Sequence, residues 1–272
     1  MSKYKLVAFD MDGTLLDSNK NIREDSLDAI ERAAKAGRIV GLSTGRNPAE
    51  IAEHRFLMPG LKYIMGTNGG IIIDNQTDEI VFHKPFENET VIKMLEISRG
   101  FDVLPHMHSK GSNFQRQDIV KMEDYGMGSY RPLFERVCTL YDDMLEEYRA
   151  NPFPVYKIGF FCHTPQIRTE LEKALSGLGI TMCYSETKSL ECTPLGVSKA
   201  SGLEIMCKIA GIDISESIAV GDGDNDLEIL KAAGLGVAMG NANERVKAIA
   251  GAVVADCDSG GIAQVIDEFL LK

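Results

Sequence analysis

The feature that most constrains this chain is an apolar run that ends abruptly in acidic residues. Residues 6–9 (LVAF) predict a buried strand, and Asp10, Asp12 and Gly13 follow it directly. Successive side chains of a strand point to opposite faces, so Asp10 and Asp12, two positions apart, can converge on one small volume. Buried carboxylates are costly unless a cation or a reaction uses them. A nucleophile beside a proton donor, both near a divalent metal, suits phosphoryl transfer.

The alternative is a metal-free turn with two solvated aspartates, because Asp and Gly are common in turns. Three distant segments favour the reactive site: residues 42–46 (LSTGR), Lys199, and residues 221–226 (GDGDND). Each follows a predicted strand or begins a predicted helix. Ligands of open parallel sheets bind at the carboxyl ends of the strands, so we expect all these segments to meet at one edge.

These segments resemble the motifs of a known family. Residues 10–15 (DMDGTL) resemble the first motif of the haloacid dehalogenase superfamily of phosphatases, and residues 42–46, Lys199 and residues 221–226 resemble its second, third and fourth motifs. The whole chain resembles the Cof-type subfamily, whose members are mostly Mg²⁺-dependent phosphatases of sugar phosphates and other small phosphorylated metabolites. The resemblance implies Mg²⁺ as the cofactor and a small phosphorylated metabolite as the partner.

Strands and helices alternate at both ends of the chain, which predicts an α/β fold with a doubly wound, mainly parallel, Rossmann-like core. The middle of the chain alternates helices with antiparallel-type strands, which predicts an inserted α+β domain. We therefore predict a core of residues 1–83 and 191–272 and a cap domain of residues 84–190. One helix and one strand already fill the segment between the first and second motifs, so this insertion resembles the C2 cap class.

Local signals predict where individual elements begin and end. Asn21, with Glu24 three positions later, predicts a helix N-cap, and Gly37 predicts the end of that helix. Residues 47–50 (NPAE) predict a second helix start, with a cap, a proline at the first position and an acid at the third. Residues 71–76 and 79–82 predict a β-hairpin.

Asp10 is the predicted nucleophile, because an ionised carboxylate can attack phosphorus in line and form an aspartyl-phosphate. Asp12 is the predicted general acid and base, which protonates the leaving alkoxide and then deprotonates water. Asp10 as a pure metal ligand, and Asp12 as a metal-binding or turn-stabilising residue, are the alternatives.

We expect Thr44 and the backbone N–H of Gly45 to hold a phosphate oxygen, because a hydroxyl and amides near a helix start bind anions. Arg46 either helps to hold the anion or pairs with an acid. Lys199 begins a predicted helix, where its ammonium would neutralise the nucleophile and the phosphoryl group. The alternatives are a simple chain turn at Thr44 and Gly45 and an exposed lysine. The other expected substrate contacts are Met11, Asn68 and Asn225.

Mg²⁺ prefers an octahedron of hard oxygens and keeps several waters, so a few carboxylates suffice to hold it. The predicted metal residues are Asp10, Asp12, Asp222 and Asp226. The resemblance implies that Asp12 contributes its backbone carbonyl. Asn225 and Asp226 would support the metal through water or orient Lys199. A solvated acidic turn is the alternative for this segment.

Within the predicted cap domain, residues 106–111 (HMHSKG) form the most polar, glycine-bearing segment, and we expect them to be a substrate loop. His106 and His108 could bind a metal, but we expect exposed, unpaired histidines. Cap residues of this kind would select the substrate by closing over it.

Composition limits the classes of partner that this chain is expected to bind. The net charge of −11 disfavours nucleic acids and anionic membranes, and no apolar run approaches the roughly 20 residues that span a bilayer. The six cysteines form no CxxC spacing, so we expect reduced thiols. No signal peptide precedes the first strand, so we expect a cytoplasmic protein. We expect the protein to be a monomer or a homodimer.

The leading hypothesis is a Mg²⁺-dependent phosphatase of small phosphomonoesters that acts through an aspartyl-phosphate on Asp10. A phosphomutase of the phosphomannomutase type is one alternative, because such enzymes share the DxDGT start. A phospho-receiver or binding protein on a related fold is another, because receivers also combine aspartates, a threonine and a lysine around Mg²⁺.

Overall fold

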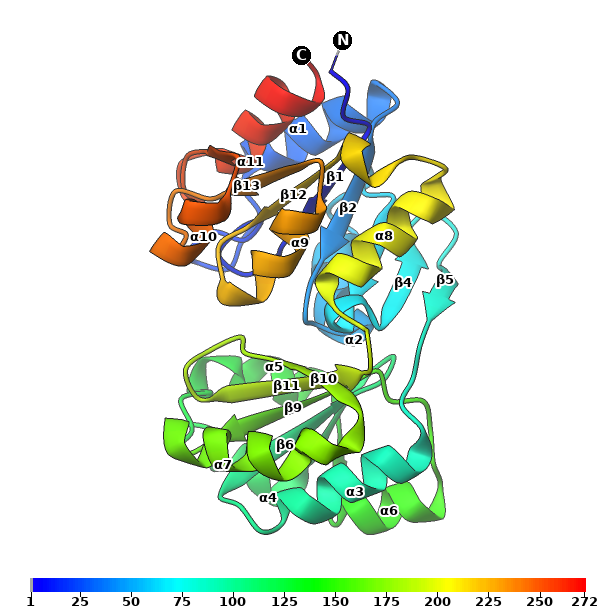
Figure 1. Cartoon of the computed structure of the whole chain (residues 1–272), viewed down its shortest axis with the longest axis vertical. Coiled ribbons are helices and arrows are strands. Elements are labelled where there is room, and N and C mark those ends of the chain that lie inside the picture. Colours follow the sequence, from blue (N-terminus) through cyan, green and yellow to red (C-terminus); the bar gives the residue numbers. More distant parts are fainter. Residues whose placement is uncertain (1) are drawn as a thin grey trace. The chain divides into compact units, whose positions relative to one another are not determined.

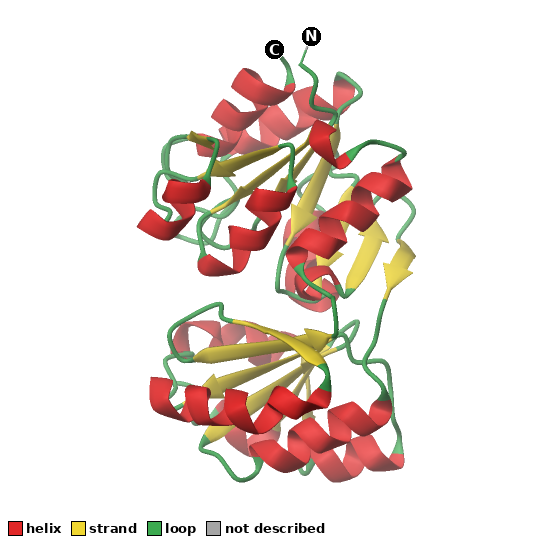
Figure 2. Cartoon of the chain, viewed as in Figure 1, coloured by secondary structure: helices red, strands yellow, loops and turns green. Residues whose placement is uncertain are grey.

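The computed structural model describes residues 2–272, which divide into two compact units (Figure 1). The first unit comprises residues 2–45, 52–83 and 198–272. The second unit comprises residues 46–51 and 84–197. Each unit contains one sheet with helices packed on it (Figure 2).

The first unit is built on a mainly parallel sheet. Among the described residues it has eight strands in the order β14-β13-β12-β1-β2-β3-β4-β5. All neighbours are parallel except the last two pairs, β3–β4 and β4–β5, which are antiparallel. The strands are β1 (Leu6–Phe9), β2 (Ile39–Ser43), β3 (Tyr63–Gly66), β4 (Ile71–Asp74), β5 (Glu79–His83), β12 (Ser217–Gly221), β13 (Leu235–Ala238) and β14 (Ala252–Val253). The predicted core class and the predicted hairpin are confirmed.

Helices cover both faces of this sheet, with α1 and α11 on one face and α8 and α9 on the other (Figure 1). All four residues of β1 are buried, as expected for a strand that has helices on both sides. The helices are α1 (Glu24–Lys35), α8 (Lys199–Ala210), α9 (Leu227–Ala232), α10 (Glu244–Ile249) and α11 (Gly261–Val265), followed by a π-helical turn (Ile266–Leu270).

The predicted N-cap of the first helix is wrong. Helix α1 begins at Glu24, and its cap position is Arg23, whose side chain makes no capping bond. Asn21 instead belongs to the preceding loop, where its N–H donates to the Asp17 carboxylate at 2.8 Å. Acidic residues in the first turn favour the helix start through the helix dipole. The predicted terminator holds, because Gly37 follows the helix with φ of 75°.

Helix α2 (Pro48–Arg55) begins in the second unit and continues in the first. Asn47 caps it: its side-chain oxygen accepts the N–H groups of Ala49 and Glu50 at 3.0 and 3.2 Å. In return, the Glu50 carboxylate accepts the Asn47 N–H at 3.1 Å. This reciprocal cap confirms the helix start that residues 47–50 predict.

The second unit contains a mostly antiparallel sheet. Among the described residues it has six strands in the order β10-β11-β9-β6-β7-β8, and only β7 and β8 are parallel. These strands are β6 (Val103–His108), β7 (Ser112–Gln115), β8 (Cys138–Tyr141), β9 (Lys157–Cys162), β10 (Ile180–Cys183) and β11 (Ser189–Pro194). The helices are α3 (Asn88–Ser98), α4 (Arg116–Ile119), α5 (Arg131–Val137), α6 (Met144–Ala150) and α7 (Pro165–Leu175). This unit has the α+β character that the sequence predicts.

Strand β6 alternates its side chains between two separate cores. Met107 packs with residues of α3, α6 and α7, whereas Leu104 packs with Phe114 and Phe134. His106 and His108 share the face of Leu104 and are 1% and 4% exposed. The expectation that these histidines are exposed on a substrate loop is wrong, because the alternation of a buried strand turns both rings inward.

Candidate active site

The first motif begins where β1 ends. Asp10 extends the strand by one bond, from its N–H to the Val220 carbonyl at 2.9 Å, and is 6% exposed. Gly13 has φ of 77°, and a Cβ there would lie 2.4 Å from the Asp222 carboxylate. Only glycine therefore lets this loop turn so close to the loop after β12. The Thr14 hydroxyl joins the two loops by donating to Asp222 at 2.9 Å.

The loop after β12 folds around one buried carboxylate. One oxygen of Asp226 accepts the N–H groups of Asp222 and Gly223 at 3.0 and 3.1 Å. A Cβ at Gly221 would lie 2.4 Å from this carboxylate, so the strand end must be glycine for Asp226 to reach it. Asp226 thereby holds the loop that presents Asp222.

Lys199 joins the first and fourth motifs. It is the first residue of α8, and a capping box between Ser198 and Ser201 fixes that helix start. Its ammonium donates to Asp10 at 2.5 Å and to the second oxygen of Asp226 at 2.7 Å. Three of the four predicted motifs, the first, third and fourth, therefore meet within the first unit.

The loop after β3 supports this lysine. Gly69 has φ of 94°, and a Cβ there would lie 2.4 Å from the Ser198 carbonyl. A Cβ at Gly202 would lie 2.9 Å from the Gly69 Cα, so two glycines let the loop and α8 touch. Sequence reasoning missed Gly202 and Thr14. Thr14 could have been found, because it lies inside the DMDGTL run and carries a hydroxyl. No local sequence pattern points to Gly202.

The second motif lies against the same loop. The Thr44 N–H donates to the Met65 carbonyl at 2.8 Å, and the Thr44 carbonyl accepts the Asn68 N–H at 3.0 Å. Thr44 and Asn68 are both buried, and Asn68 holds a left-handed backbone with φ of 55°. Such a conformation in a non-glycine residue is strained and is common at functional sites.

The remaining predicted contacts are less closely grouped. Met11 is fully buried, and Asn225 is partly buried within the loop after β12. Gly45 ends a segment of the first unit, whereas Arg46 begins the segment that belongs to the second unit. The Asp12 carboxylate lies outside the metal-competent cluster and pairs with Lys20 at 2.9 Å.

The charges of this site fit a divalent cation. Oxygens of Asp10, Asp222 and Asp226 lie within 4.8 Å of one another. With Lys199 as the paired cation, two negative charges of this cluster stay unbalanced when all three acids are ionised. Hard carboxylate oxygens are the ligands that Mg²⁺ prefers. Asp10 and Asp222 are the better donors, because Asp226 already accepts three hydrogen bonds, one of them from the Lys199 ammonium.

Burial dominates the protonation of these groups. It raises the pKa of Asp10 well above its usual range, and the nearby Asp226 and Asp222 add to this effect against the opposing charge of Lys199. Burial likewise raises the pKa of Asp222 to about 6. Burial alone would lower the pKa of Lys199, but the charges of Asp10 and Asp226 outweigh it and raise that pKa. Lys199 is therefore a permanent cation at neutral pH.

Proton competition at Asp222 predicts a pH-dependent response to Mg²⁺. A carboxyl whose pKa is raised by folding binds protons more tightly in the folded chain, so the contribution of Asp222 to the stability of the metal-free chain falls as pH rises from about 4 to about 6. Mg²⁺ binds the ionised carboxylates, so its stabilising effect grows over the same range. Thermal unfolding with and without Mg²⁺, at about pH 5 and about pH 7.5, measures both trends.

In this experiment the Asp222→Asn variant is the control, and it should lose most of the pH dependence of the Mg²⁺ response. Equal Mg²⁺-induced shifts of the wild-type Tm at the two pH values would contradict the prediction.

The family of the chain follows from its comparison with known proteins. The model of the haloacid dehalogenase-like hydrolase family matches residues 7–266. The chain therefore belongs to this hydrolase family, as its four motifs predict.

Individual relatives agree with this assignment. The phosphatase YwpJ of Bacillus subtilis is 27% identical over 295 residues, which cover 98% of this chain and 100% of that protein. The 5-amino-6-(5-phospho-D-ribitylamino)uracil phosphatase YitU of the same organism is 28% identical, with 98% of each chain covered. A crystal structure of a haloacid dehalogenase-like hydrolase from Bacteroides thetaiotaomicron superimposes with a TM-score of 0.82 at 28% identity, covering 97% of this chain and 98% of that one.

These findings confirm the predicted fold class and the predicted enzyme class, a phosphoric monoester hydrolase. They leave the roles of the individual site residues as proposals. Among residues 2–272, no helix is long and apolar enough to cross a membrane. In the described part of the chain, all six cysteines are free of disulfides.

Proposed function

We propose that this chain is a Mg²⁺-dependent phosphatase that hydrolyses small phosphomonoesters through an aspartyl-phosphate on Asp10. The observation that carries the proposal is the buried cluster in which Lys199 bridges Asp10 and Asp226, with Asp222 beside them. A buried ion network of this kind costs free energy, and a reaction that needs a fixed carboxylate accounts for it.

Asp10 is suited to attack because Lys199 fixes one of its oxygens, and the charge of Lys199 opposes the burial that raises the pKa of Asp10. A carboxylate oxygen forms a bond to phosphorus as the P–O bond to the leaving group breaks. Asp12 gives its proton to the departing alkoxide and later takes one from the water that cleaves the acyl-phosphate. Asp12 can serve both steps because it is partly exposed, so it can exchange protons with water, and its carboxylate pairs with Lys20 at 2.9 Å.

Mg²⁺ would be held by Asp10, Asp222 and the backbone carbonyl of Asp12, and when bound it offsets the charge of the phosphoryl group. Asp226 serves this site indirectly. It orients Lys199 through one oxygen and the Asp222 loop through the other. The ammonium of Lys199, which lies next to the nucleophile, would also stabilise the charge that gathers on the phosphoryl oxygens.

Thr44 and the N–H of Gly45 are the proposed phosphate ligands of the second motif. Asn68 and Lys199 approach the same region, because backbone contacts tie the loop after β3 both to Thr44 and to the start of α8. Met11, Arg46 and Asn225 complete the proposed set of substrate contacts.

The proposed substrates are small phosphorylated metabolites, such as sugar phosphates. Relatives that align over nearly the whole chain support this class, because one is named for a phosphorylated ribitylamino compound. Their names also favour hydrolysis over the phosphomutase and phospho-receiver alternatives.

Phosphate release from a panel of sugar phosphates, nucleotides, pyridoxal phosphate and flavin mononucleotide tests this proposal. We expect release with Mg²⁺, none after chelation, and a rank order that defines the substrate class. Isomerised sugar phosphate that appears only with a bisphosphate activator, instead of free phosphate, would establish a mutase and overturn the proposal.

A further inference from the structure

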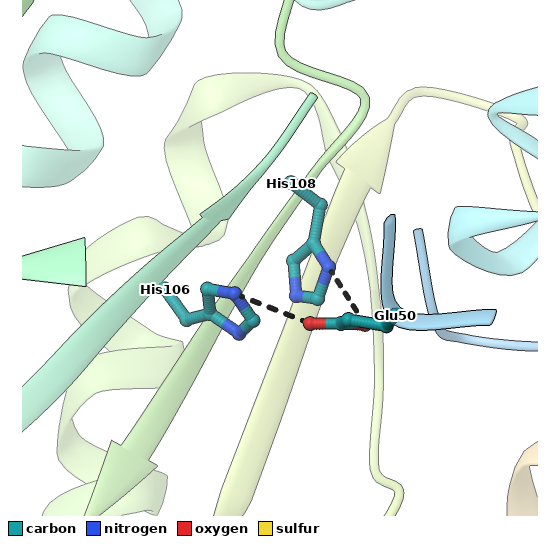
Figure 3. Close-up of side chains that lie close together, drawn as sticks. All are labelled: Glu50, His106 and His108. Carbon is teal, nitrogen blue, oxygen red and sulfur yellow. Dashed lines mark ion pairs between the residues drawn. The ribbon is translucent and has the colours of Figure 1, made fainter. Parts of the chain in front are cut away.

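A second cluster of side chains that can ligate a metal lies within the second unit and shares no residue with the candidate active site. His106 and His108 project from the same face of β6, and Glu50 from the first turn of α2 points between them (Figure 3). All three are at least nine-tenths buried. One atom from each, an imidazole nitrogen or a carboxylate oxygen, lies within 4.8 Å of the others.

The distances within this cluster suit a shared cation better than hydrogen bonds. His106 Nε2 lies 3.5 Å from one Glu50 oxygen, and His108 Nδ1 lies 3.8 Å from the other. Two ligands of a tetrahedral metal, each bonded at 2.0–2.1 Å, are about 3.3 Å apart. The buried Nε2 of His106 makes no hydrogen bond to any described residue. A buried nitrogen without a partner is costly, and a metal ion would satisfy it.

The two imidazoles are in the neutral state that metal binding requires. Burial lowers the pKa of both His106 and His108 well below the usual range, so both imidazoles are neutral and keep a lone pair. The nearby Lys157 adds to this effect on both rings. Burial raises the pKa of Glu50, and the hydrogen bond from Ser112 and the charge of Lys157 oppose this effect only in part.

Surrounding groups hold the cluster in place. The Ser112 hydroxyl donates to one Glu50 oxygen at 2.6 Å, and the Asn47 N–H donates to the other at 3.1 Å. The Asn47 side-chain amide donates to Ser112 at 2.7 Å and lies 3.2 Å from His108 Nδ1. Partners of this kind fix the orientation of metal ligands. Binding through His108 Nδ1 would exchange this last contact for a metal bond.

The charge of Lys157 does not prevent a cation from binding here. Lys157 lies opposite His108 in the β6–β9 pair and is paired with Glu191 at 2.6 Å. Because Lys157 already pairs with Glu191, part of the negative charge of Glu50 remains unneutralised and can attract a cation. Phe114 and Phe134 pack against His106 and keep the surroundings apolar, which strengthens the attraction for a cation.

We propose that Glu50, His106 and His108 form a second metal site, which takes Zn²⁺ or a similar imidazole-binding divalent ion. Two histidines and one glutamate are an established Zn²⁺ ligand set, whereas Mg²⁺ prefers oxygen ligands alone. The bound ion would tie the start of α2, which directly follows the second motif, to the sheet of the second unit.

Titration of the metal-free chain with Co²⁺, in excess Mg²⁺, tests the proposal through the visible absorption of the bound ion. We expect one equivalent of Co²⁺ to give the intense bands of a tetrahedral centre, and Zn²⁺ to displace it. His106→Phe keeps the ring packing but removes a ligand, and Glu50→Gln removes the charge. Each should weaken binding by at least about 100-fold.

Two matched variants separate this site from other sources of binding. His163→Gln changes a half-exposed histidine that pairs with Asp102, and it should bind Co²⁺ like the wild type. Asp10→Asn disrupts the catalytic cluster and should also keep the tetrahedral bands. Their loss in Asp10→Asn but not in His106→Phe would overturn the proposal, as would octahedral or absent bands in the wild type, whichever variants fold.

Discussion

Replacing Asp10 by asparagine is expected to abolish phosphate release, lowering kcat by at least about 1,000-fold. The amide has no charged oxygen to attack phosphorus, so no covalent intermediate forms. Lys199 keeps its second partner, Asp226 at 2.7 Å, so the ammonium is not left unpaired. Steady-state turnover and rapid-quench detection of a labile phosphoenzyme on the wild type measure this effect.

The same substitution should leave the metal-free chain as stable as the wild type or more stable. Burial and the neighbouring acids raise the pKa of Asp10, so its ionised form is costly at neutral pH. Asp224→Asn is the matched control, because Asp224 lies in the loop after β12 but pairs with Arg245 at 2.7 Å. Full turnover by Asp10→Asn on every active substrate would show that another group is the nucleophile.

Replacing Lys199 by methionine is expected to damage both catalysis and stability. Methionine fills a similar volume but leaves Asp10 and Asp226 buried without their cation, which costs about 3–5 kcal/mol when a buried pair is broken. The loss of positive charge beside the phosphoryl group lowers kcat by about 10²–10³-fold. Urea unfolding and phosphate release measure the two effects.

Mg²⁺ should stabilise Lys199→Met more than it stabilises the wild type, because the divalent ion then replaces part of the missing charge. Lys208→Met, on the exposed face of the same helix α8, is the matched control and should change neither quantity. If Lys199→Met unfolds at the wild-type urea concentration, the bridge to Asp10 and Asp226 carries no net stability.

Much of the fold was predictable because local patterns specify it. The apolar run of residues 6–9 and the acids behind it predict a buried strand with a reactive edge, and β1 and Asp10 agree. Asn47, with an acid three residues later, predicts a helix start, and the reciprocal cap of α2 agrees. In both cases, neighbours in sequence supply the forces that decide the structure.

The histidines of β6 could not be placed in this way. A sequence of two histidines separated by one residue predicts a shared face, but not whether that face meets water or another element. The buried Glu50 that faces them is more than fifty positions away in sequence. The predicted start of α1 is wrong because Asn21 lies in the preceding loop, where its backbone N–H donates to the Asp17 carboxylate.

By itself the sequence determined the α/β class, the alternation of strands and helices in the core, and which acids, threonine and lysine are candidates for the site. Only the tertiary structure decided which atoms meet: Lys199 with Asp10 and Asp226, Thr14 with Asp222, and Glu50 with two histidines. The reason is the range of the forces. Propensity, capping and apolar periodicity act over a few residues, whereas these contacts join residues far apart in the chain, whose geometry depends on how whole strands and loops pack.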